Sequence, residues 1–298
     1  MYKLGINTGF AVNRYSDPKS WCEIINKCNV KYVQLTADLI NPSLPDKIID
    51  EQINQINFWK NEFDIEIRST FTGAFTRLNH LTHPNQNIRK YWISWFKKFA
   101  EISVRVGAKT MGSHFGILTT SEYNDKDISE KRIIEAISYW HEIGSYGKKI
   151  GLKQILWEPM SVGREFGETI EKCLALQNRL NSNAPLPFKI CLDVDHGDIS
   201  SKNPNDYNPY KWLEKFCELS PVIHLKQSSN NKNGHWPFTK EYNKYGKIVP
   251  EKVLDILKKK RVYDVDLVLE LSFKEREPWD SSIESDLIES SVFWQKYL

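Results

Sequence analysis

The chain alternates eight times between a short apolar segment and an amphipathic helix, and no other feature constrains its fold as strongly. We expect the apolar segments to be strands, at residues 4–6, 31–35, 65–69, 110–115, 154–158, 189–193, 222–225 and 266–272. We expect helices from Pro18 onward and at residues 46–63, 85–106, 129–150, 168–180, 209–219, 250–260 and 281–297. Strands that alternate with helices favour a parallel sheet, and eight of them favour closure into a barrel. The pattern therefore predicts an α/β fold, a single (β/α)8 TIM barrel domain over residues 1–298.

Charge and composition argue against several classes of protein. The 41 Lys and Arg residues and the 38 Asp and Glu residues are interspersed and leave a net charge of +3, whereas nucleic-acid binders cluster basic groups on one face. No apolar stretch is long enough to span a membrane, and the first residues do not resemble a secretion signal. The five cysteines include no Cys-x-x-Cys pair, which is typical of reduced, non-ligating thiols. We expect a soluble cytoplasmic protein that binds neither nucleic acid nor membranes.

Four residues of metal-ligand type stand at the ends of the last four predicted strands. In a (β/α)8 barrel the carboxyl ends of the strands share one cup, where the catalytic groups project. The residues are Glu158, Asp193, His224 and Glu270. Three carboxylates and one imidazole suit a hard or borderline divalent ion, Mn²⁺, Mg²⁺ or Co²⁺, better than Zn²⁺. The sequence therefore predicts one divalent metal ion as cofactor.

These segments resemble a known family. The strings Ile-Leu-Trp-Glu-Pro at 155–159, Leu-Asp-Val-Asp-His at 192–196, Ile-His-Leu at 223–225 and Leu-Glu-Leu at 269–271 are similar to the metal-site segments of the xylose-isomerase-like TIM barrels. The resemblance implies that Glu158, Asp193, His224 and Glu270 ligate one cation. Asp193 and His196 match the Asp-x-x-His pattern of the ketose 3-epimerases, in which the histidine contacts substrate oxygens. A dimer or tetramer is usual for the family.

A narrower likeness lies in two further strings. Trp-Pro-Phe-Thr at 236–239 and Gly-Ile-Asn-Thr-Gly-Phe-Ala at 5–11 are similar to segments of the tetrulose-phosphate (erythrulose-phosphate) isomerases and epimerases. The expected reaction is 3-epimerisation of a short ketose phosphate through a metal-stabilised enediolate. Glu158 and Glu270 come from two different strands and are the natural pair to remove the C3 proton and to return one to the opposite face.

Several other residues are expected to bind the sugar or sugar phosphate. Lys226, two residues beyond His224, should point to the same side, and with Gln227, His235 and Arg164 it is a candidate for the phosphate. Asn7 and His114 stand at the ends of earlier strands, as does Gln34, and Trp157 adjoins the site as a candidate wall. The polar segment 70–82 is long enough to cover the cup, and we expect His80, within it, and His83, just beyond it, on the surface.

The ligand types leave other activities open. Aldose–ketose isomerisation would use the same groups, and so would 3-epimerisation of an unphosphorylated ketose or dehydration of a cyclic polyol. A barrel that binds sugar without catalysis is a further alternative. A DNA-repair endonuclease of the same superfamily is disfavoured because such enzymes gather three zinc ions with many histidines, whereas this chain has seven histidines in all.

Overall fold

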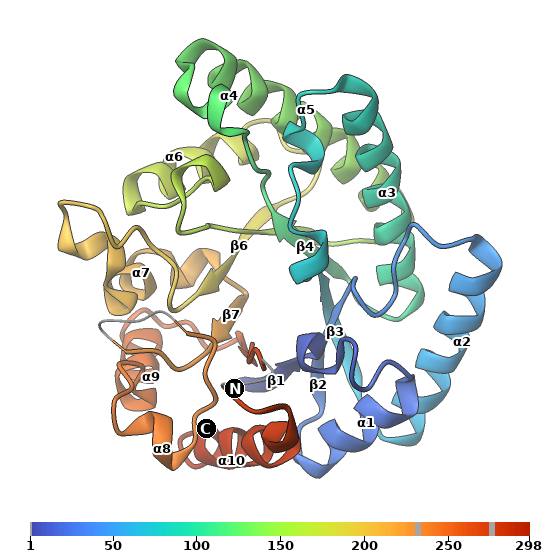
Figure 1. The fold of residues 1–298 in the computed structure, drawn as a ribbon, viewed down its shortest axis with the longest axis vertical. Helices are drawn as coiled ribbons and strands as arrows, with labels where there is room; N and C mark the ends of the chain where they lie inside the picture. Colours follow the sequence, from blue (N-terminus) through green and yellow to red (C-terminus); the bar gives the residue numbers. More distant parts are fainter. Residues whose placement is uncertain (1, 230–233, 274–277) are drawn as a thin grey trace.

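A closed parallel barrel forms the centre of the computed structural model, which describes residues 2–229, 234–273 and 278–298 (Figure 1). Each strand pairs with the next in chain order, and β8 closes the barrel by pairing with β1. The strands are β1 (Lys3–Asn7), β2 (Tyr32–Thr36), β3 (Glu66–Phe71), β4 (Thr110–His114), β5 (Gln154–Glu158), β6 (Phe188–Asp193), β7 (Val222–Leu225) and β8 (Asp266–Leu269). The predicted (β/α)8 TIM barrel is confirmed.

Helices surround the barrel and connect its strands (Figure 1). They are α1 (Pro18–Lys27), α2 (Asp46–Glu62), α3 (Gln86–Arg105), α4 (Thr120–Asn124), α5 (Lys126–Ile150), α6 (Ile170–Asn181), α7 (Pro209–Phe216), α8 (Lys240–Asn243), α9 (Pro250–Lys259) and α10 (Ile283–Gln295). The local sequence determines where several helices begin. At the start of α1 the Asp17 carboxylate accepts a hydrogen bond from the Ser20 amide, and Pro18 is the first helical residue. The Asp125 carboxylate caps α5 in the same way. None of the helices within the described ranges is both long and apolar enough to cross a membrane.

The strand boundaries differ from the prediction by more than one residue at two places. β3 runs to Phe71, two residues beyond its predicted end, because it pairs with β2 as far as Thr36. β8 ends at Leu269, where its pairing with β1 stops at Ile6, so Glu270 lies just past the strand. Glu270 is still fixed on the β7 side, since its amide donates to the Leu225 carbonyl at 3.0 Å.

Two apolar layers hold the barrel together. Inside it, a small buried cluster comprises Phe71, Leu156, Cys191, Val222 and Val268. A much larger core lies between the outer surface of the barrel and the helices. Gly112 leaves the room that Phe71 occupies, since a Cβ there would stand 2.8 Å from Leu156 Cβ and closer still to the Phe71 ring. The inner cluster forms the floor on which the polar residues described below stand.

Candidate active site and metal centre

The period of two along each strand brings the four predicted ligands together. Successive side chains on a strand point to opposite faces, so the residue two beyond an inward side chain also points inward. Each ligand stands two residues after a member of the inner apolar cluster: Glu158 after Leu156, Asp193 after Cys191, His224 after Val222 and Glu270 after Val268. One ligand-type atom from each of the four lies within 4.8 Å of the others.

His224 lies between two carboxylates of this cluster. Its Nδ1 is 3.3 Å from Glu158 Oε1 and 3.4 Å from Glu270 Oε1. Burial by itself would lower the pKa of His224, but Cys191, Glu270 and Glu158 outweigh it and hold the pKa well above its usual value. The same contact holds the pKa of Glu270 well below its usual value despite the opposing effect of burial. Nδ1 is therefore the nitrogen that faces the carboxylates and the centre of the cluster.

Lys226 is the fully buried cation of the site. Its Nζ lies 2.5 Å from Asp193 Oδ2, 3.1 Å from His235 Nε2 and 3.4 Å from His196 Nε2. Burial would raise the pKa of Asp193, but the neighbouring His196 and Lys226 outweigh it and keep the pKa below its ordinary value. His196 also approaches the ligands directly, with Nε2 3.4 Å from Asp193 Oδ2 and Nδ1 3.6 Å from Glu158 Oε1. The ammonium therefore neutralises Asp193 and connects the two histidines.

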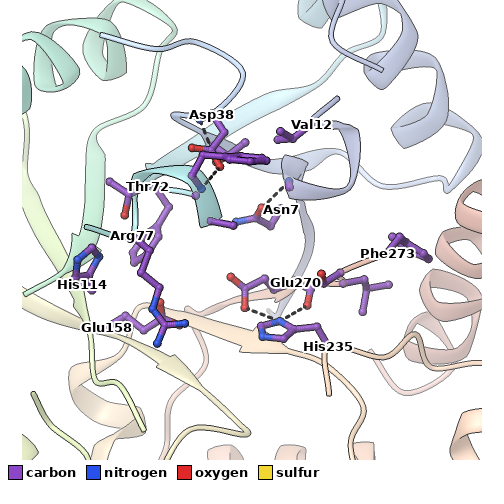
Figure 2. Close-up of a pocket in the computed structure, with 18 of the residues that line it drawn as sticks. Asn7, Val12, Asp38, Thr72, Arg77, His114, Glu158, His235, Glu270 and Phe273 are labelled. Carbon is purple, nitrogen blue, oxygen red and sulfur yellow. Dashed lines mark hydrogen bonds and ion pairs between the residues drawn. The ribbon is translucent and has the colours of Figure 1, made fainter. Parts of the chain in front are cut away.

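A cavity of about 490 Å³ opens above the cluster (Figure 2). Glu158 and Glu270 form part of its base, and His114, His196 and His235 line it as well. Further wall residues come from the loops after β1, β3 and β8, at residues 9–14, 72–77 and 271–273, and from Thr36, Asp38 and Met160. The segment 70–82, expected to cover the cup, thus contributes a side wall of the cavity.

The structure places the predicted substrate-binding residues in three groups. Asn7, His114, His196 and His235 line the cavity, and Lys226 lies among the ligands without lining it. The other three, Trp157, Gln227 and Arg164, do not face the cavity. The four lining residues stay candidates for substrate binding.

The expectations for Trp157, Gln227 and Arg164 need correction. Trp157 falls between the inward residues Leu156 and Glu158, so it points outward and donates from Nε1 to Gln177 Oε1 at 2.6 Å. Gln227 follows the inward-pointing Lys226 and therefore points away from the cavity. Its side-chain amide stabilises the loop after β7 by donating to Asn243 Oδ1 and to the Ile248 carbonyl. Arg164 lies outside the cavity, with Nη2 3.3 Å from Glu165 Oε1.

Asp38 and Arg77 are among the residues of the cavity wall that were missed from the sequence. Asp38, just past β2, accepts from the Phe75 amide at 3.1 Å and from the Thr76 hydroxyl at 3.3 Å, which fixes the loop after β3. Arg77, on that same loop, points into the cavity (Figure 2). Neither stands at a strand end, and the sequence signal concerns Arg77 alone, a charged residue in an unusually long polar connection.

A chain of hydrogen bonds sets the orientation of His224. The Asn7 Oδ1 atom accepts from the Gly9 amide at 2.7 Å, so Asn7 Nδ2 is the atom that donates to Gln34 Oε1, also at 2.7 Å. Gln34 Oε1 lies 2.7 Å from His224 Nε2, and Gln34 Nε2 donates to Ser69 Oγ at 3.2 Å. Because Gln34 presents an acceptor, Nε2 of His224 carries a proton, so Nδ1 is the nitrogen that offers a lone pair when the ring is neutral, as a metal ligand must be.

His80 is buried, which corrects the expectation of a surface position. Its side chain is 0% exposed and packs among the rings of Trp92, Phe96, Trp140 and His114, with 4.2 Å between the two imidazole centroids. Burial holds its pKa well below the usual value, helped by His114. Burial also lowers the pKa of His114 to about 4. Both imidazoles are therefore neutral in the folded protein at neutral pH.

We expect this pair to make the free energy of unfolding fall with acid. Between pH 6.5 and about 4 the unfolded chain binds protons that the folded pair does not, so the stability is complete above pH 6.5 and is lost as the pH falls toward 4. The lowering of the His114 pKa from 6.5 to about 4 corresponds to about 3 kcal/mol. His80→Asn, at a position with φ of +31° that asparagine tolerates, should flatten the decline. Urea unfolding at pH 7 and pH 5 measures the change in the free energy of unfolding. If that change were the same in His80→Asn and the wild type, the buried histidine pair would not be its cause.

Comparison with known proteins identifies similar sequences and structures. A family model described as "Xylose isomerase-like TIM barrel" matches residues 22–289. The chain is 39% identical over 297 residues to D-erythrulose 1-phosphate 3-epimerase of Brucella abortus (strain 2308), covering 99% of this chain and 96% of the relative. A putative xylose isomerase from Rhodospirillum rubrum superposes with a TM-score of 0.90 at 22% identity over 100% of both chains. D-Psicose 3-epimerase from Clostridium cellulolyticum H10 superposes with a TM-score of 0.71 at 14% identity, covering 99% of both chains.

Proposed function

The chain belongs to the xylose isomerase-like TIM barrel family, and from this premise we propose that it is a divalent-metal-dependent 3-epimerase of a short ketose phosphate. The substrate we propose is D-erythrulose 1-phosphate, on which the Brucella abortus relative is named as acting. The meeting of Glu158, Asp193, His224 and Glu270 within 4.8 Å carries the proposal, since it supplies both a cation site and two carboxylates for proton transfer.

The donor set fits a divalent cation. The Oε2 atom of Glu270 is buried and accepts no hydrogen bond from the described residues, although His235 Nδ1 lies at 3.4 Å and Lys226 Nζ at 4.0 Å. Carboxylate oxygens and an imidazole nitrogen are ligands of Mn²⁺, Mg²⁺ and Co²⁺. Glu158, Asp193, Glu270 and Nδ1 of His224 would hold the ion. When bound, a divalent cation supplies Lewis-acid stabilisation of the negative charge that develops on the substrate oxygens during enolisation.

We assign the movement of the proton at C3 to the two glutamates. They come from β5 and from the end of β8, with β6 and β7 between them, and both line the cavity. One carboxylate takes the C3 proton, the electron pair of the C–H bond forms the C2–C3 double bond, and the π pair of the C2 carbonyl moves to its oxygen to give the enediolate. The other glutamate, once protonated, gives a proton to the opposite face of C3, which inverts that centre. His196, beside Glu158 and Asp193, lines the cavity and is our candidate for contact with a substrate oxygen.

Solvent exchange tests the proposal directly. Ketose phosphate incubated with the Mn²⁺-loaded enzyme in D₂O should gain deuterium at C3 and yield the C3 epimer, both observable by ¹H NMR. Label at C1 together with an aldose product would show aldose–ketose isomerisation instead. An absence of exchange with tetrulose, pentulose and hexulose phosphates under several divalent ions would contradict the proposed reaction.

We expect Gln34 to strengthen metal binding by holding the His224 tautomer. Gln34→Leu removes the acceptor for Nε2–H, and loss of such a partner typically costs about 10- to 100-fold in metal affinity. Isothermal titration of the metal-free protein with Mn²⁺ measures the effect. Gln154→Leu is the matched control, because this strand glutamine donates to the Thr110 hydroxyl at the start of β5, away from the cluster. Equal affinities for the wild type and Gln34→Leu would rule out this role.

A further inference from the structure

We propose that Arg77, held in place by Glu165, binds the phosphate group of the substrate. The inference rests on the proposed function, because it assumes a phosphorylated ketose in the cavity. Arg77 is 46% exposed and lines the cavity on the loop after β3, in the same wall as His114 and Glu158 (Figure 2).

Two carboxylates fix the position of Arg77. Asp38 holds the short 3-10 helix Ala74–Thr76, which immediately precedes Arg77, through the Phe75 amide and the Thr76 hydroxyl. Glu165, whose side chain is only 5% exposed, accepts on Oε2 from Arg77 Nε at 3.0 Å and from Arg77 Nη2. A guanidinium anchored through one edge loses little conformational freedom when its remaining donors bind a ligand.

The charge around Glu165 favours an anion. Its Oε1 also lies 3.3 Å from Nη2 of Arg164, so two guanidinium groups share a single carboxylate and leave an excess positive charge. Arg77 is the member of this group that faces the cavity. The Arg164 side chain, expected from the sequence to meet the phosphate, would then act through its charge on the far side of Glu165.

Arg77 retains donors for a ligand. Its Nη1 donates to none of the described residues, so a guanidinium edge remains for the paired oxygens of a phosphate. Among the described residues, the other arginine that lines the cavity is already used: Arg14 bonds Asp280 through Nε at 2.8 Å and the carbonyls of Val12 and Phe273 through its terminal nitrogens. Lys226 is committed to Asp193.

The position also suits the substrate. In a 1-phosphorylated 2-ketose the phosphate is attached to the carbon beside the carbonyl, so it must lie close to the group that contacts the cluster. Arg77 lines the same cavity as Glu158. Its charge also helps to lower the pKa of His114, which pairs with Glu158 in the register of β4 and β5. An anion at Arg77 therefore leaves the carbonyl end of the ketose beside Glu158.

Kinetics with matched substrates test the inference. Arg77→Met should lower kcat/KM for D-erythrulose 1-phosphate about 10- to 100-fold, the size expected for loss of a charge-assisted hydrogen bond, and leave C3 exchange of unphosphorylated D-erythrulose within about twofold. Arg77→Lys keeps the positive charge but loses the two-pronged guanidinium, so its kcat/KM for D-erythrulose 1-phosphate should lie between those of the wild type and Arg77→Met. Arg105→Met is the control, since Arg105 is 45% exposed and pairs with one carboxylate, Asp50, outside the cavity.

A binding measurement separates this inference from the proposed reaction. Titration of inorganic phosphate into the Mg²⁺-loaded protein should give at least tenfold weaker affinity for Arg77→Met than for the wild type and Arg105→Met. Equal phosphate affinity, or equal losses with both ketoses, would overturn the role of Arg77 even if the enzyme epimerises the substrate. Lost phosphate binding in Arg77→Met without any C3 exchange by the wild type would support the phosphate site and contradict the proposed reaction.

Discussion

Replacing Glu158 or Glu270 with glutamine is expected to lower the rate of C3 proton exchange on the order of 10³-fold. Glutamine keeps the shape of the side chain but can neither accept nor return a proton, and general acid–base catalysis typically contributes about 10²- to 10⁴-fold. Each change also removes a proposed ligand of the cation. The rates are therefore compared at saturating Mn²⁺, with the metal content of each variant measured in the same sample.

Glu66→Gln provides the control for these variants. Glu66 also stands on a barrel strand, but at the start of β3, where it pairs with Arg68 at 2.8 Å and does not line the cavity. Its activity should match the wild type. If Glu158→Gln and Glu270→Gln both kept more than a tenth of the wild-type exchange rate with metal bound, the proposed pair of proton carriers would be wrong.

Removal of divalent cations should abolish activity, and their return should stabilise the fold. An ion that binds only the folded state at 100 times its Kd adds about 2.7 kcal/mol to the free energy of unfolding, which corresponds to about 5 °C in Tm for a chain of this size. Dialysis against a chelator, followed by thermal unfolding with and without Mn²⁺, measures the shift. Elemental analysis should find one ion per chain after reloading.

The Glu270→Gln variant tests whether the shift belongs to this cluster. Glu270 is half-buried at the base of the cavity, and its loss removes one of the four ligand groups that meet there. Its Tm should respond much less to Mn²⁺ than that of the wild type. An equal shift in both proteins would place the stabilising ion elsewhere in the molecule.

The sequence predicted the four-residue cluster because barrel geometry transmits strand position directly into space. Once Glu158, Asp193, His224 and Glu270 are assigned to the ends of consecutive strands, closure of the barrel leaves little freedom in where they meet. The same period of two correctly placed Lys226 on the side of His224. Applied to Trp157 and Gln227, it would also have shown that both point away from the cavity.

The loops could not be predicted in the same way. The position of Arg77 depends on Asp38 from the β2 loop and Glu165 from the β5 loop, 39 and 88 residues away along the chain. Such contacts follow no periodicity, because loop conformation is set by tertiary packing. His80 illustrates the same point: a histidine in a polar segment is buried because Trp92, Phe96 and Trp140 from the neighbouring helices enclose it.

The division of labour between strand ends and loops has an evolutionary consequence. The proposed proton-transfer groups come from β5 and the end of β8, whereas Asp38 and Arg77, which also line the cavity, lie on loops of the first half of the chain. Mutations in those loops can change which sugars are accepted while the shared chemistry is inherited intact. A laboratory library confined to residues 72–77 would be a compact route to new ketose specificities on this scaffold.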